Sequence, residues 1–144
     1  MSEPAYLPDV NVLVALSDPS HIHHLKADNW RQRIGIARFL LCPITEAGFV
    51  RLMANPSVGG LSMSGATLLL QEIATLPNVA HLPVAPTWLE LIEPFTPRLH
   101  GYRQVTDALL LGLVIRNGAI LVTLDRAIKA LAGEAYAANL LTLA

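Results

Sequence analysis

Four acidic side chains are placed where they could act together on one ligand: Asp9, Glu46, Asp107 and Asp125. Three of them follow short apolar segments, and the fourth interrupts a longer apolar segment, where a lone buried charge is expensive. Converging carboxylates repel one another unless a cation neutralises them. Oxygen ligands without paired Cys or His spacing favour Mg²⁺ or Mn²⁺ over Zn²⁺. The pattern therefore predicts a divalent-cation site.

The same residue types also have a purely structural use. Asp9, Asp107 and Asp125 each precede or start a predicted helix, where an Asp that caps exposed N–H groups stabilises by about 1 kcal/mol. Glu46 falls in a first helical turn, where the helix dipole favours an acid. The functional interpretation therefore rests on the whole set and on three polar neighbours: Asn11, Thr106 and Thr123.

Short apolar strands and helices alternate along the chain and must position these acids. Strands are expected at 6–9, 38–42, 79–82, 119–124 and 139–143, and helices at 10–16, 21–33, 43–53, 65–76, 87–95, 105–116 and 128–131. This alternation predicts an α/β fold, a three-layer sandwich with a short central parallel sheet flanked by helices. Ligands of such sheets bind beyond the carboxyl ends of the strands, where Asp9, Glu46 and Asp125 are expected.

Length and composition predict one domain, residues 1–144, that does not span a membrane. The longest apolar run, 108–115, falls well short of the roughly 20 residues that a spanning helix needs. No secretory signal is visible, and the single Cys42 suits a reducing compartment, so we expect a cytoplasmic protein. The formal net charge is −1, and leaving the four acids out of the count gives +3 for the rest of the protein, which permits a phosphate-binding face.

The chain is unusually apolar, with 53% hydrophobic residues and a mean hydropathy of +0.46. One core does not need so many apolar side chains, so we expect some of them to form an interface with a partner. The expected contributors are the helices at 44–53, 87–95 and 10–16.

Four segments around the acids resemble PIN-domain ribonucleases, and within them VapC, the toxin of bacterial VapBC toxin–antitoxin pairs. They are Leu7-Pro8-Asp9-Val10-Asn11-Val12-Leu13, Cys42-Pro43-Ile44-Thr45-Glu46, Gln104-Val105-Thr106-Asp107-Ala108 and Val122-Thr123-Leu124-Asp125-Arg126. The resemblance covers almost the whole chain, with the blocks in order and at typical spacing. It implies a PIN-like sandwich and a Mg²⁺- or Mn²⁺-dependent endoribonuclease. It also implies a homodimer silenced by a VapB-like antitoxin.

The resemblance also implies roles for individual residues. Asp9, Glu46 and Asp107 match the core metal-binding acids, and Asp125 matches a fourth, more variable one. Thr123 matches a polar position that helps to place the metal or its water, and Asn11 is a further candidate in the catalytic set. Candidate RNA contacts are His100 and Arg103 before Asp107, and Arg51 about one turn after Glu46. The alternative for each of them is a solvated side chain without a role in binding.

Two other functions remain open from the residues alone. Asp9-Val10-Asn11 suggests a phosphatase with a strand-end Asp nucleophile, although such enzymes want a second Asp where Asn11 stands. A non-catalytic module that binds RNA or a protein is the other alternative. Intact acids argue against it, because a pure binder gains nothing from carboxylates that face phosphates. The cluster His21, His23 and His24 is interpreted as packing or surface rather than as a metal site.

Overall fold

The computed structural model describes residues 3–143 and contains a five-stranded, fully parallel sheet. In space the strand order is β3-β2-β1-β4-β5. The strands are β1 (Ala5–Pro8), β2 (Arg38–Leu41), β3 (Val79–His81), β4 (Ile120–Thr123) and β5 (Leu140–Thr142). Within the described residues, no helix is long and apolar enough to cross a membrane.

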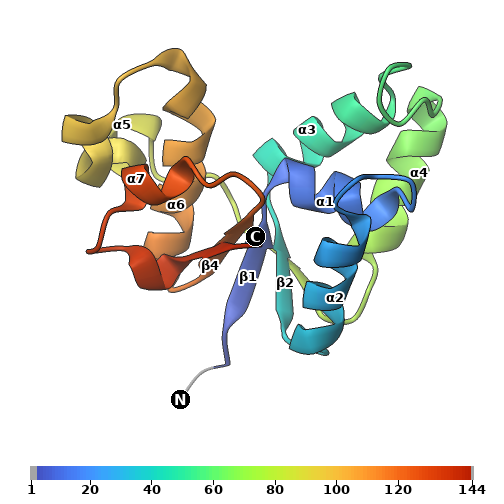
Figure 1. Ribbon diagram of the computed structural model, residues 1–144, viewed down its shortest axis with the longest axis horizontal. Helices are drawn as coiled ribbons and strands as arrows, with labels where there is room; N and C mark the ends of the chain where they lie inside the picture. The colour runs from blue at the N-terminus through green and yellow to red at the C-terminus, as the bar shows by residue number, and fades with distance from the viewer. Residues whose placement is uncertain (1–2, 144) are drawn as a thin grey trace.

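Helices cover both faces of this sheet (Figure 1). One layer holds α1 (Val10–Ser17), α2 (His24–Ile34), α3 (Pro43–Met53) and α4 (Met63–Ala74). The other holds α5 (Trp88–Ile92), α6 (Val105–Arg116) and α7 (Ile128–Ala132), with short 3₁₀ segments η1 (Glu93–Arg98), η2 (Tyr102–Gln104) and η3 (Ala137–Asn139). The three-layer α/β sandwich predicted from the sequence is confirmed.

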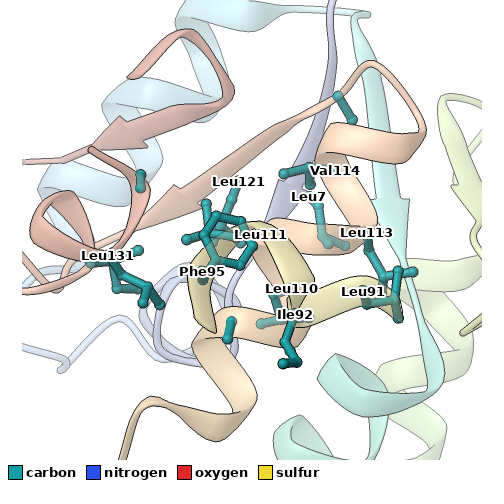
Figure 2. Close-up of a cluster of buried hydrophobic side chains, with 14 of the residues drawn as sticks. Leu7, Leu91, Ile92, Phe95, Leu110, Leu111, Leu113, Val114, Leu121 and Leu131 are labelled. Atoms are coloured by element: carbon teal, nitrogen blue, oxygen red, sulfur yellow. The ribbon is translucent and has the colours of Figure 1, made fainter. Parts of the chain in front are cut away.

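Alternation along the strands divides the core into two clusters, one on each face of the sheet. Leu7, Leu40 and Leu121 pack into the cluster under α5, α6 and α7 that Figure 2 shows. Their strand neighbours Phe39 and Val122 pack into the cluster under α1 to α4. Because successive strand residues point to opposite faces, apolar strands without alternation require cover on both sides.

The order of the strands places the candidate site at the centre of the sheet. The chain moves outward from β1 to β2 and β3 and then returns to β4, which pairs with β1 on its other side. The strand order therefore reverses between β1 and β4. In open parallel sheets, ligands bind at the carboxyl ends of the strands beside such a reversal.

Several predicted element boundaries differ from the structure for local reasons. The predicted helix 21–33 begins only at His24, because two side chains hold the preceding turn: Asp18 Oδ1 accepts from the Ser20 N–H and His21 Nδ1 from the His23 N–H. The predicted helix 65–76 is Met63–Ala74, capped by Ser62. The predicted helix 87–95 is a single α segment, Trp88–Ile92, followed by a 3₁₀ segment that contains Pro94 and Pro97.

Candidate active site

Asp9 lies at the end of β1 and begins α1. Its N–H donates to the Val122 carbonyl of β4 at 2.8 Å, which continues the β1–β4 ladder into the site. Its side chain is only 8% exposed. Oδ1 accepts the Asn11 N–H at 2.9 Å, and Oδ2 accepts the Thr123 hydroxyl at 2.9 Å. Burial raises the pKa of Asp9 above its ordinary value although both hydrogen bonds lower it, and the Asp125 charge raises it further.

Thr123 joins two of the acids. It is the last residue of β4 and is fully buried. Its hydroxyl donates to Asp9 and accepts the Asp125 N–H at 3.0 Å. Asp125 in turn accepts the Ala127 N–H at 2.9 Å, which fixes the exposed turn before α7. One hydroxyl therefore connects the carboxylate at the end of β1 to the backbone of the loop that carries Asp125.

Asp107 reaches the same edge from α6. The helix leads into β4 and runs antiparallel to it, so its first turn lies at the carboxyl edge of the sheet (Figure 1). Burial raises the pKa of Asp107 to about 6, and the charges of Asp9 and Asp125 contribute to the rise. Its side chain makes no hydrogen bond to any described residue, in contrast to Asp9 and Asp125. Helix capping therefore accounts for Asp9 but leaves Asp107 unexplained.

The three aspartates carry the charges that a divalent cation would neutralise. The burial of Asp9 and Asp107, together with the repulsion from neighbouring carboxylates, disfavours their ionised forms, and a divalent cation would reverse this effect. All the donor atoms are oxygens, which suits Mg²⁺ or Mn²⁺. Within residues 3–143, however, no three or more His, Cys, Asp or Glu side chains form a group that could hold an ion together. The charges therefore fit a cation, while these side-chain positions are not a complete ligand set.

Comparison with known proteins places this arrangement in a family. The model of the PIN domain matches residues 6–134. Ribonuclease VapC38 of Mycobacterium tuberculosis (strain ATCC 25618 / H37Rv) is 40% identical over 130 residues, which cover 89% of this chain and 90% of that protein. The chain belongs to the VapC family of PIN-domain ribonucleases.

A second VapC relative and the solved structures agree with this assignment. Ribonuclease VapC39 of the same organism is 37% identical over 125 residues, covering 85% of this chain and 89% of that protein. Mycobacterium tuberculosis VapC20 has a TM-score of 0.65 at 13% identity, covering 88% of this chain and 94% of that one. VapBC2 from Rickettsia felis has a TM-score of 0.63 at 14% identity, with coverages of 88% and 92%. At these identities the structures show that the fold is that of VapC.

Glu46, the remaining acid of the VapC pattern, is carried by the helix that follows β2. It is half-buried in the first turn of α3 and lines a mostly apolar groove between α3 and α4. It is not among the charges that raise the pKa of Asp9 or Asp107. Arg51 lines the same groove with its side chain exposed. Both residues stay predictions for the site.

The loop before Asp107 contains the other two candidate RNA contacts, His100 and Arg103, both exposed. Gln104 holds this loop, because its Oε1 accepts the His100 N–H at 2.6 Å and the Gly101 N–H at 3.3 Å. Arg98 ties the start of the loop to the end of α7 by donating to the Leu131 carbonyl at 2.8 Å. Gln104 was assigned no role from the sequence, and only its spacing from the Gly101 turn could have indicated that it holds this loop.

Asn11 contributes to the site through its backbone, since its N–H bonds Asp9 while its side chain is exposed. Of the three histidines, by contrast, His21 and His23 lie in the connection between α1 and α2, and His24 begins α2. Nδ1 of His24 lies 2.7 Å from the Ala15 carbonyl oxygen, and His21 holds the turn described above. These contacts are structural, in agreement with the interpretation from the sequence.

Proposed function

We propose that this chain is an endoribonuclease toxin that hydrolyses RNA phosphodiester bonds at the β1–β4 edge with the help of Mg²⁺ or Mn²⁺. The observation that carries the proposal is the gathering of Asp9, Asp107 and Asp125 at one edge of the sheet, where burial, together with the charges of Asp9 and Asp125, raises the pKa of Asp107 to about 6. The family supports the reaction class, because its members are named ribonucleases. We expect cleavage to give products with 5′-phosphate and 3′-hydroxyl ends, as the resemblance to PIN-domain ribonucleases implies.

Each residue has a distinct part in this proposal. Asp9 and Asp107 would hold the cation. Each Asp9 oxygen accepts one hydrogen bond and keeps a lone pair for a ligand. Thr123 fixes the orientation of the Asp9 carboxylate, and the Asp125 carboxylate, positioned by the same hydroxyl, would orient the attacking water. When bound, the cation supplies charge for a phosphoryl oxygen and lowers the pKa of its coordinated water.

A metal titration tests the site directly. We expect the EDTA-treated protein to be inactive on mixed RNA and to recover with Mn²⁺ or Mg²⁺. Calorimetry should show Mn²⁺ binding that Asp9→Asn and Asp107→Asn each weaken, because each removes a charged ligand. Asp28→Asn, on the outer part of α2, is the matched control and should bind Mn²⁺ like the parent. Full RNA cleavage in EDTA would overturn the metal role, and release of phosphate from monoesters without RNA cleavage would favour a phosphatase.

We further propose that the chain forms a homodimer and binds a VapB-like antitoxin. Apolar side chains are exposed on the outer helices, with Leu89 of α5 71% exposed and Met63 of α4 also exposed. Of the expected contributors, α1 offers little apolar surface, because Val12 to Ala15 are buried against the sheet and the neighbouring helices, and Val10 and Leu16 are half-buried. The interface is therefore sought on α5 and on the groove between α3 and α4.

Light scattering at micromolar concentration should give twice the 15.5 kDa mass of the chain. Leu89→Glu should shift the mass toward a monomer, because it places a charge in an apolar contact. Ile36→Glu, which changes an 89% exposed side chain at the other end of the sheet, is the control and should stay dimeric. A monomeric parent protein would refute the dimer without affecting the proposed chemistry.

A further inference from the structure

Tyr102 is the most exposed aromatic side chain of the described residues, at 82%. The other seven Phe, Tyr and Trp side chains are buried, half-buried or, for Trp88, 38% exposed. Tyr102 also packs against neither of the two core clusters. A large aromatic ring that contributes nothing to the core and stands in water is poorly explained by folding alone.

A cation accompanies this ring. The Arg103 guanidinium carbon lies 5.8 Å from the centroid of the Tyr102 ring, within the range of a cation–π contact. Arg103 Nε also approaches the Tyr102 hydroxyl oxygen at 3.4 Å. The pair thus presents an aromatic surface and a positive charge together. These two features are the ones that single-stranded nucleic acid uses, because its bases stack and its phosphates pair with cations.

The segment that carries the pair is held in place from both sides. Gln104 accepts two N–H groups of the preceding turn and donates to the Arg98 carbonyl oxygen at 3.4 Å. Arg98 is bonded to the carbonyl of Leu131 at the end of α7. A ring that is exposed yet carried on a fixed backbone loses little conformational freedom when a ligand stacks on it.

The position of the pair relates it to the acids. The 3₁₀ turn that contains Tyr102 and Arg103 leads directly into α6, which carries Asp107 in its first turn. Along the helix axis, Tyr102 and Asp107 are separated by about 8 to 9 Å. Two or three nucleotides, spaced by about 3.4 Å along a stacked strand, cover that distance.

We propose that Tyr102 stacks on a base of single-stranded RNA within a few nucleotides of the scissile bond, while Arg103 binds a neighbouring phosphate. The inference rests on the proposed function and adds a substrate preference to it, for unpaired over duplex RNA. Bases inside a duplex keep their faces covered, so only unpaired bases can use the ring. RNA is favoured over a protein as occupant because a cation contacts the exposed ring and the pair leads into the helix that carries Asp107.

The test compares Tyr102→Ala, Tyr102→Leu and Tyr102→Phe on a single-stranded and a duplex RNA of the same sequence. Loss of one stacked base corresponds to an effect of about five- to 150-fold. We therefore expect Ala to lower kcat/KM on the single strand about tenfold, mainly through KM, and Leu to resemble Ala. Phe should restore the parent values, because it keeps the ring. Ile36→Ala, which removes another exposed apolar side chain, should have no effect.

A binding measurement without cleavage separates this inference from the proposed function. In EDTA, single-stranded RNA that contains 2-aminopurine should lose fluorescence on the parent protein and on Tyr102→Phe, but much less on Tyr102→Ala. Equal quenching and equal KM in Tyr102→Ala would overturn the stacking role even if the enzyme cleaves RNA. If the Ala variant instead cleaves normally and only escapes inhibition by the antitoxin, Tyr102 is a protein contact and the inference is wrong. A parent protein that quenches but never cleaves would refute the proposed function alone.

Discussion

Asp107→Asn is expected to abolish RNA cleavage and, at the same time, to stabilise the metal-free protein. Asn keeps the shape of the side chain but loses the negative charge that a divalent cation needs. Loss of a residue that only supports a metal ligand typically costs about 10–100-fold, so loss of a ligand itself should cost at least about a hundredfold in kcat/KM. A cap would behave differently, because Asn caps a helix as well as Asp does.

The gain in stability has a defined pH window. Because the pKa of Asp107 is raised to about 6 in the folded state, its ionisation opposes folding. The stabilising contribution of its protonated form is complete below about pH 4 and is lost as the pH rises through 6. This pKa shift corresponds to roughly 3 kcal/mol at about 1.36 kcal/mol per pKa unit. Because Asp107 is only half-buried, solvent screening reduces its effect on the free energy of unfolding to about 1–2 kcal/mol. The free energy of unfolding of Asp107→Asn in EDTA should exceed that of the parent at pH 7 and match it near pH 4.

Urea denaturation at the two pH values measures this difference, and the cleavage assay measures the activity. Asp28→Asn serves as the control, because among residues 3–143 its carboxylate bonds only Gln32 on the surface of α2. It should change neither the activity nor the pH dependence. An Asp107→Asn protein that still cleaves RNA at the parent rate would remove Asp107 from the site, whatever its stability.

The sequence predicts most of this fold because its apolar strands are short and unambiguous. The segments around Leu7, Leu40 and Leu121 are apolar on both faces, which only a sheet covered on both sides satisfies. The start of α2 and the end of α5 were harder to predict. They depend on the side-chain bonds of Asp18 and His21 and on the prolines after Ile92, which override helix periodicity locally.

The site was predictable to the extent that topology decides it. Asp9 and Asp125 follow strands that the structure pairs, so their convergence follows from a parallel sheet. The direction of the Glu46 side chain depends on how α3 packs, which periodicity does not report. The sequence did not indicate a binding role for Tyr102, for a different reason. A single aromatic residue has the same sequence signature in a core and on a surface, and only its exposure distinguishes the two.

Thr123→Val is expected to reduce cleavage about 10–100-fold although it leaves every carboxylate in place. Valine has the shape of threonine without the hydroxyl that donates to Asp9 and accepts from the Asp125 N–H. Loss of that hydroxyl leaves a buried Asp9 oxygen unsatisfied, which costs about 1–3 kcal/mol of stability. It also frees Asp9 to rotate and loosens the loop that carries Asp125, and loss of such support typically costs 10–100-fold in metal affinity or activity.

The neighbouring strand offers a matched control for this variant. Thr142 pairs directly with Thr123 in the β4–β5 register, and its buried hydroxyl oxygen has no hydrogen-bond partner in the described part of the chain. Thr142→Val should therefore leave cleavage unchanged and hold or raise the free energy of unfolding, because it removes a buried polar group that bonds nothing. Thr123→Ser should restore most of the activity, since it keeps the hydroxyl.

The three variants are compared by their kcat/KM at saturating Mn²⁺, their Mn²⁺ affinity and their urea denaturation. If both valine variants lose activity equally, the effect comes from packing at the end of the sheet. Loss in Thr123→Val alone, with rescue by Ser, assigns it to the hydroxyl that connects Asp9 to Asp125.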